Sequence, residues 1–365
     1  MKKIQQVVLG LLYIIMTALL VFPGAAAAEE TETPEVTEVG GFTYEVILPE
    51  NQLDKEVGYF DLQLAAGRKQ TIQIKLTNPT NIETTLSVEL SGAKTNSNGV
   101  IEYTSNEIEN DASLKYDFMD VVKGPEEVVL APGEERMLDL EVTMPEASFD
   151  GIITGGIQLR NITNEEELDK QKEGTVINKF AYLIGVVLQQ TDTEVTHDLA
   201  LNKVYAGLNN YRNTIFVNFS NIQPAFVAEM TVDAQITKKG SKDVLYDTKK
   251  ASMKMAPNSL IDFPVSMQGD RMVAGDYTAY ITVTTEVDTW TWEQDFTITN
   301  EEAEKYNEED VGMIQETGID WKLIAAIVAG VFVLVLIIYL VIRQVKKKKS
   351  TKKRKKTKTK KKKRN

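Results

Sequence analysis

The sequence predicts an all-β ectodomain of two immunoglobulin-like β-sandwich domains, followed by a single transmembrane helix. Three observations lead to this prediction: apolar and polar residues alternate through most of the chain, one long uncharged apolar run lies near the C-terminus, and a basic tail follows it. Helical patterns are scarce between the two ends of the chain. The 365 residues therefore divide into an exported β-rich part and a membrane segment.

The N-terminus is typical of a secretory signal peptide. Two lysines precede an apolar stretch, Val7 to Phe22, and the small residues Ala25 to Ala28 follow it. Cleavage after Ala28 would remove residues 1–28, and cleavage after Ala27 fits the same pattern. The alternative is an uncleaved second anchor.

The C-terminal apolar run predicts a membrane span. The twenty residues from Leu323 to Ile342 extend about 30 Å as a helix, which matches the hydrocarbon thickness of a bilayer. We place the transmembrane helix at residues 321–342. The tail, residues 343–365, contains sixteen Lys and Arg and no acid, so the positive-inside rule puts it in the cytoplasm and the preceding chain outside.

A short motif before this run resembles a wall-sorting signal. Ile314 to Gly318 reads IQETG, close to the LPxTG signal that precedes an apolar span and basic residues in sortase substrates. Gln315 stands where that signal has proline. We therefore expect the helix to be retained, with covalent wall attachment as the alternative.

Charge is distributed unevenly along the chain. The net charge is −12 in all, but the segment from Glu29 to Asp320 holds 22 bases and all 53 acids, a net charge of −31. Such a surface does not suit nucleic acid, which is bound by neutralising its phosphates. It fits basic or neutral partners, although acidity also simply keeps an exported protein soluble.

Alternation with a period of two predicts half-buried strands in two domains. Ile72, Ile74 and Leu76 alternate with polar residues in the first, and Ile215, Val217 and Phe219 do so in the second. We place the domains at residues 40–190 and 191–300, and an acidic stalk at residues 301–320. One helical pattern, Asn110 to Val122, interrupts the first domain.

Residues for catalysis and for metal or cofactor binding are few. There is no cysteine, which excludes disulfides and thiolate sites. His197 is the only histidine, so a catalytic triad would depend on one residue in a predicted linker. We expect no enzyme, no cofactor and no metal centre. A hydrolase that uses two carboxylates is the remaining catalytic alternative, because 53 acids supply many candidate pairs.

Aromatic side chains supply the candidate binding sites. Tyr59 and Phe60, with the neighbouring Asn51 and Gln52, are candidates for ligand binding, because aromatic faces accept sugar rings. A second group, Tyr280, Trp290 and Trp292, is a candidate for partner binding. Trp290 and Trp292 lie two residues apart on a predicted strand and should point the same way. Packing in the cores is the alternative for all of these aromatic residues.

Several motifs, in order, resemble the WxL-interacting proteins of Gram-positive bacteria. The first domain carries LPENQ (Leu48 to Gln52), GYF (Gly58 to Phe60) and MPEASFDGIITGGI (Met144 to Ile157). The second carries MAPNS (Met255 to Ser259) and TWEQDFTI (Thr291 to Ile298). The resemblance implies a non-catalytic surface protein whose first domain binds peptidoglycan and whose second binds the WxL domain of a secreted partner.

These observations favour one function and leave two alternatives. The favoured function is a membrane-anchored adaptor between peptidoglycan and a WxL-domain protein at a Gram-positive surface. A host-directed adhesin that binds a glycan or a matrix protein has the same sequence features. The carboxylate-dependent wall hydrolase is the third.

Overall fold

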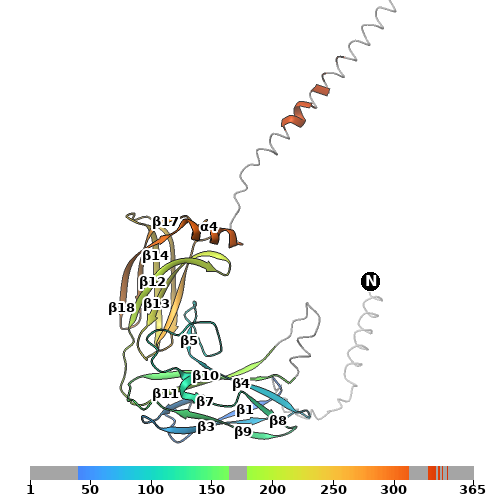
Figure 1. Cartoon of the computed structure of the whole chain (residues 1–365), viewed down its shortest axis with the longest axis vertical. Coiled ribbons are helices and arrows are strands. Elements are labelled where there is room, and N and C mark those ends of the chain that lie inside the picture. Colours follow the sequence, from blue (N-terminus) through green and yellow to red (C-terminus); the bar gives the residue numbers. More distant parts are fainter. Residues whose placement is uncertain are drawn as a thin grey trace, which may run out of the picture. The chain divides into compact units, whose positions relative to one another are not determined.

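The computed structural model describes residues 40–163 and 179–311, together with 328–333, 336, 337, 339 and 343. The main part forms two compact units, and the chain passes from the first to the second between Val195 and Thr196. Each unit is a β-sandwich of two sheets (Figure 1). Both units are therefore all-β, as the alternation predicts.

The first unit packs a four-stranded sheet on a five-stranded one. The four-stranded sheet has the order β1-β3-β9-β7: β1 (Thr43–Ile47), β3 (Lys69–Thr77), β9 (Glu135–Thr143) and β7 (Val122–Lys123). The five-stranded sheet has the order β2-β11-β10-β4-β8: β2 (Phe60–Gln63), β11 (Ala181–Gln189), β10 (Ile152–Asn161), β4 (Thr84–Gly92) and β8 (Glu127–Leu130). Among the strands of these two sheets, only β2 and β11 pair in parallel.

The core of the first unit follows from the alternation. In β3, Ile72, Ile74 and Leu76 are at most 1% exposed, while the residues between them are half-buried. Successive side chains of a strand point to opposite faces, so one face of each sheet supplies the core. Phe60 and Phe118 fill the space between the sheets.

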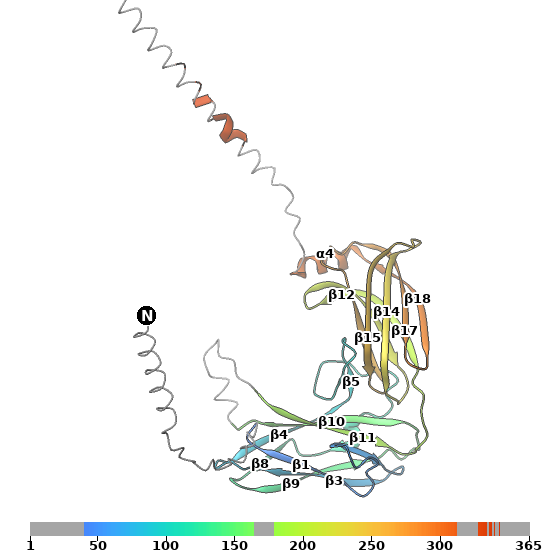
Figure 2. The same cartoon turned by 180° about the vertical axis from the view of Figure 1, so that it is seen from behind.

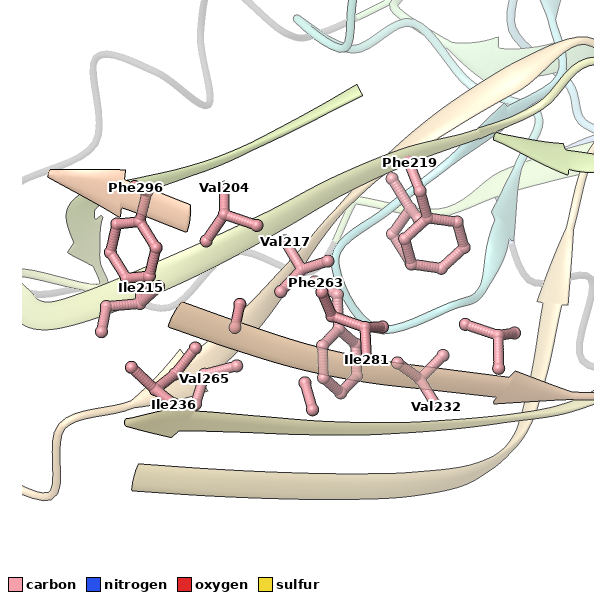
Figure 3. Close-up of a cluster of buried hydrophobic side chains, with 14 of the residues drawn as sticks. Val204, Ile215, Val217, Phe219, Val232, Ile236, Phe263, Val265, Ile281 and Phe296 are labelled. Atoms are coloured by element: carbon pink, nitrogen blue, oxygen red, sulfur yellow. The ribbon is translucent and has the colours of Figure 1, made fainter. Parts of the chain in front are cut away.

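The second unit packs a three-stranded sheet on a four-stranded one. The three-stranded sheet has the order β12-β13-β16: β12 (Leu199–Asn209), β13 (Arg212–Asn221) and β16 (Ser259–Ser266). The other has the order β15-β14-β17-β18: β15 (Val244–Met255), β14 (Val227–Lys238), β17 (Gly275–Thr284) and β18 (Thr289–Ile298). Figure 3 shows Val217, Phe219, Phe263 and Ile281 meeting between the two layers.

A buried asparagine occupies an equivalent place in each unit. Asn78, at the end of β3, donates from Nδ2 to the carbonyls of Leu130 and Ala131 at 3.1 and 3.0 Å. Asn221, at the end of β13, donates to the carbonyls of Ala225 and Ala256 at 2.7 and 3.0 Å. Both side chains are 0% exposed. Each asparagine thus ties its strand to an Ala-Pro turn that leads into another strand.

The acidic segment that we expected to be a stalk is partly folded onto the second unit. Residues Asn300–Glu309 form helix α4, which begins with a capping box between Thr299 and Glu302. Asn307 is 6% exposed and accepts a hydrogen bond from Asn213 Nδ2 at 2.9 Å. Figure 2 shows α4 across one end of the strands. A stalk beginning at residue 301 is therefore wrong, because one face of α4 packs against β12 and β13.

The second unit includes residues from within the sequence of the first. Residues 94–101 and 108–113 belong to it, and the first of these segments contains β5 (Lys94–Thr95) and the beginning of β6 (Ile101–Glu102). The hydroxyls of Thr95 and Ser259 lie 2.6 Å apart, and Lys254 N donates to Gly99 O at 2.8 Å. Ser220 also hydrogen-bonds to Asp111. The second unit is therefore discontinuous in sequence.

These contacts explain why the predicted helix from 110 to 122 is mostly absent. Only Phe118–Val121 form a helix, α2, capped by Asp117. Asp111 accepts hydrogen bonds from Ser220 and from Ser113 N. Side chains that bond to other strands or to nearby backbone compete with helix formation.

The predicted signal peptide, the basic tail except Arg343, and most of the predicted span lie outside the described residues. The described residues of the span, 328–333, 336, 337 and 339, are helical. Among all described residues, none belongs to a helix that is long and apolar enough to cross a membrane.

We predict that substituting Gly99 destabilises the second unit more than substituting Gly240. Both glycines have positive φ, +68° and +80°, but a Cβ at Gly99 would lie 2.6 Å from Met253, whereas Gly240 has no neighbour within 4 Å. Alanine at either site costs about 1 kcal/mol in backbone strain. Gly99→Ala should cost about 1–3 kcal/mol more through overpacking. Denaturant unfolding of residues 29–311 measures both, and equal losses would contradict the close packing of Gly99 against Met253.

Candidate functional site

On the outer face of the five-stranded sheet in the first unit, two adjacent positions are glycines, so the backbone there is not covered by side chains of its own. Gly156 of β10 and Gly185 of β11 are directly paired across the two strands. Their neighbour Gly155 faces the other way, where a Cβ would strike Phe118 in the core. Two paired glycines on one sheet face allow other groups to lie directly on the backbone.

Two tyrosines and a leucine lie next to these two paired glycines. A Cβ at Gly185 would lie 3.6 Å from Tyr59 Cβ, and a Cβ at Gly156 would lie 2.4 Å from the main-chain oxygen of Tyr103 and 2.9 Å from Leu183 Cδ1. Tyr59 is 38% exposed and Leu183 is 44% exposed. We call these five residues (Tyr59, Tyr103, Gly156, Leu183 and Gly185) the tyrosine face.

Gln52 holds the loop that places Tyr59. Its Nε2 donates to the carbonyls of Asp54 at 2.8 Å and Tyr59 at 3.0 Å, and its Oε1 accepts from Asp61 N at 3.2 Å. The side chain is 5% exposed. Its amide is thus engaged within the protein, and Gln52 positions Tyr59 rather than offering a polar group to a ligand.

Asn51 has a similar structural role. Its Nδ2 donates to Gln63 O at 3.0 Å, and its Oδ1 accepts from Gln70 Nε2 at 2.9 Å. These bonds link the loop before β2 to the end of β2 and to β3. Asn51 and Gln52, both predicted as ligand-binding residues, therefore lie in the framework beneath the loop.

The prediction that Phe60 binds a ligand is wrong. Its ring is 0% exposed and belongs to the core of the first unit, so it presents no surface to a ligand. Phe60 is the first residue of β2 and points into the core, whereas Tyr59 comes directly before the strand and lies over Gly185 on the outer face. Of this pair, only Tyr59 faces solvent.

Two ionisable groups at this side of the sheet, Tyr103 and Asp61, have raised pKa values. Burial is the main cause of the raised pKa of Tyr103, and Tyr59 nearby adds to it, while a hydrogen bond with Thr154 partly offsets it. Burial also raises the pKa of Asp61, which lies on the outer face of β2, and the carboxylate of Asp54 raises it further. Tyr103 therefore stays a neutral hydroxyl group.

This arrangement suits a ligand with an apolar face and hydroxyl groups. Aromatic rings contribute flat apolar contact area together with a hydroxyl tip. Asp61 supplies an acceptor at the same face, and Leu183 supplies further apolar area. A sugar ring combines the same two kinds of surface.

Sequence reasoning found Tyr59 but missed Tyr103. The position of Tyr103 depends on Gly156, which lies 53 positions further along the chain, so no local pattern identifies it. The Gly155-Gly156 pair in GIITGGI was the available signal, because glycines inside a predicted strand indicate close approach of another backbone.

The structure separates the three aromatic residues predicted for partner binding. Trp290 and Trp292 pair with Val283 and Ile281, which face the core, and the two tryptophans pack partly against it. Trp290 Nε1 donates to Asp198 Oδ1 at 3.0 Å. Tyr280 is 41% exposed and lies on the opposite face, since its neighbour Ile281 points inward. The two tryptophans share a face, as predicted, but Tyr280 does not join them.

Within residues 40–163 and 179–311, no three His, Cys, Asp or Glu side chains gather in a way that could hold a metal ion. His197, the only histidine, contacts the ring of Trp290, with centroids 5.8 Å apart. The described part of the chain thus offers surfaces for contact, and the tyrosine face is the best defined of them.

Comparisons with known proteins match both units to one family. Residues 42–161 match the family model described as WxL Interacting Protein, peptidoglycan binding domain. Residues 171–308 match the model described as WxL Interacting Protein, host binding domain. No curated protein matches the chain.

Similar solved structures include two fimbrial chaperones. The Class 5 fimbriae chaperone CfaA is 11% identical, with 69% of this chain and 99% of that chain covered, at a TM-score of 0.26. The E. coli chaperone DraB is 12% identical, with 71% and 98% covered, at a TM-score of 0.26. With identities and TM-scores this low, these two structures carry no argument about the fold or the function of this chain.

We predict that Gly156→Ala disrupts the tyrosine face and that Gly185→Ala does not. A Cβ at Gly156 would lie 2.4 Å from the Tyr103 main-chain oxygen, whereas at Gly185 the nearest atom is at an ordinary 3.6 Å. Overpacking at Gly156 should lower the free energy of unfolding by about 1–3 kcal/mol. Hydrogen exchange of residues 101–105 in the fragment 29–311 should quicken in G156A alone. Unchanged exchange in G156A would contradict the close contact.

Proposed function

Because the chain belongs to the WxL-interacting protein family, we propose that it is an adaptor that binds peptidoglycan through its first unit and a WxL-domain protein through its second. The family places the chain at the cell surface. The proposed role is binding without catalysis. In this role the protein holds a secreted partner against the wall.

The tyrosine face supports the first half of this proposal. Tyr59, Tyr103 and Gly156 lie within residues 42–161, which match the peptidoglycan binding domain. Leu183 and Gly185 complete the face from β11, which lies within residues 171–308. Peptidoglycan is a glycan crosslinked by short peptides, so its sugar rings offer apolar faces edged by hydroxyl groups. Tyr59 and Tyr103 can contact those faces, and Asp61 can accept from a hydroxyl. We propose that this face contacts the glycan.

The second unit has two candidate partners. Membership of a WxL-interacting family supports a WxL-domain protein, and we propose this partner first. The description of the matching model as a host binding domain favours a second candidate, a host glycan or matrix protein. Tyr280, exposed on the outer face of the β15-β14-β17-β18 sheet, is a contact candidate for either partner.

We also propose the finer features of the architecture and the topology. Both sandwiches are immunoglobulin-like, supported by the two packed sheets of mainly antiparallel strands in each unit. A signal peptide directs export, and the apolar run from Leu323 to Ile342, followed by the basic tail, anchors the chain with its two units outside. Gln315 in place of proline supports retention of this anchor.

We predict that Tyr59→Ala weakens peptidoglycan binding. Removing a partly exposed aromatic contact at a binding surface should raise the Kd about tenfold, which corresponds to about 1.4 kcal/mol. The double variant Tyr59→Ala with Tyr103→Ala should lose more. Co-sedimentation of the fragment 29–311 with purified peptidoglycan measures the change.

Tyr280→Ala is the matched control for this experiment. Tyr280 is 41% exposed and Tyr59 is 38% exposed, so both variants remove a similar exposed aromatic surface. The control should bind peptidoglycan as the unaltered fragment does. Equal binding by all the variants would reject the tyrosine face as the peptidoglycan site.

A further inference from the structure

Exposed apolar side chains gather where the chain leaves the second unit. Tyr211, at the turn between β12 and β13, is 69% exposed, Val311, after α4, is 76% exposed, and Val273, before β17, is 56% exposed. Two arginines, Arg212 and Arg271, are exposed next to them in the chain. We call these five residues the exit surface.

Hydrogen bonds hold the three segments of the exit surface together. Val311 N donates to Tyr211 O at 3.1 Å. Asn307 Oδ1 accepts from Asn213 Nδ2 at 2.9 Å and from Met272 N at 2.8 Å. These bonds join α4, the β12–β13 turn and the segment before β17 at one end of the unit, where Figures 1 and 2 show α4. The surface is therefore built on a rigid end of the sandwich.

The backbone at Tyr211 is strained. Asn210 and Tyr211 have φ of 50° and 58°, in the left-handed region that two-residue hairpin turns normally fill with Asn-Gly. A bulky side chain in this region is an outlier. Such outliers cluster at functional sites, and this tyrosine is 69% exposed rather than packed in the core.

The charges of the exit surface also differ from those of the exported part as a whole. Within the two long described ranges, Arg212 and Arg271 form no ion pair. The nearby Asp310 accepts from Asn213 N at 2.8 Å, and Asp270 accepts from Tyr246 Oη at 3.4 Å. Tyrosine and arginine are typical of side chains at a membrane interface, where rings and guanidinium groups reach the headgroups. The two valines add exposed apolar area beside them.

The length of the following chain limits how far this surface can lie from a membrane. Ten positions separate Val311 from Trp321, where the proposed span begins. Fully extended, ten residues reach at most about 35 Å. An anchored chain therefore keeps the exit surface near the bilayer even at full extension of this segment.

We propose that the exit surface rests on the outer surface of the lipid bilayer. Tyr211 and the two valines contact the interfacial region, and Arg212 and Arg271 contact lipid phosphates. Glu308 and Glu309, exposed on α4, oppose attraction to a strongly anionic membrane. The contact therefore does not depend on anionic lipid, and it also forms on a zwitterionic membrane. This inference rests on the proposed membrane anchor.

The absence of cysteine allows a direct test in the full chain. Val273→Cys places a fluorescent label on the exit surface. Val287→Cys places the same label on an equally apolar position, 73% exposed, in the turn between β17 and β18. This turn lies at the other end of β17, about 30 Å away by strand length. Both proteins are reconstituted into phosphatidylcholine vesicles that contain lipids spin-labelled near the headgroup.

Quenching by the spin-labelled lipids should be at least twofold greater at position 273 than at position 287. Tyr211→Ser in the Val273→Cys protein should reduce that quenching, whereas Tyr280→Ser, an exposed tyrosine elsewhere in the unit, should leave it unchanged. Quenching at position 273 should not require an anionic lipid such as phosphatidylglycerol in the vesicles. Equal quenching at the two positions would overturn the inference.

Extraction of the vesicles at alkaline pH separates this result from failure of the anchor. Protein that stays with the vesicles while both labels are equally quenched contradicts the exit-surface contact alone. Protein that is released by alkali contradicts the anchor, and with it the contact.

Discussion

In each unit, one fully buried asparagine joins a strand end to the turn that starts another strand. Asn78 and Asn221 use their amide hydrogens on carbonyls next to an Ala-Pro turn, and their Oδ1 atoms accept from the backbone two residues ahead. The chain has no cysteine, so no disulfide can fix these connections. Leaving one buried carbonyl or amide without a partner costs about 1–3 kcal/mol, which makes these turns specific as well as stable.

Fixed strand connections position both proposed contact surfaces. In the first unit, the main chain of Tyr103 lies directly on the backbone at Gly156, which pairs with Gly185. The Gln52 side chain holds the main chain of Tyr59 next to Gly185. In the second unit, Asn213 and Asn307 bring α4 onto the end of the sandwich. Each surface therefore depends on a few buried amide side chains, and the tyrosine face depends also on glycines that permit close approach.

The strands were predictable because their pattern is local. The pattern in β3 shows this, because the alternation of Ile72, Ile74 and Leu76 with polar residues predicts a strand from these positions alone. The same rule, applied to β2, would have put Phe60 inside together with Leu62. Contacts between distant segments could not be predicted in this way. Tyr103 depends on Gly156, and the expected helix at Asn110 gives way because Asp111 bonds to Ser220.

The adaptor proposal requires that one molecule hold the wall and a partner at once. The most direct test mixes peptidoglycan, the fragment 29–311, which contains both complete units, and a purified WxL-domain protein from the same bacterium, and then pellets the peptidoglycan. We predict that the WxL protein enters the pellet in proportion to the fragment and stays in solution without it. A WxL protein that stays in solution while the fragment pellets would contradict the adaptor function.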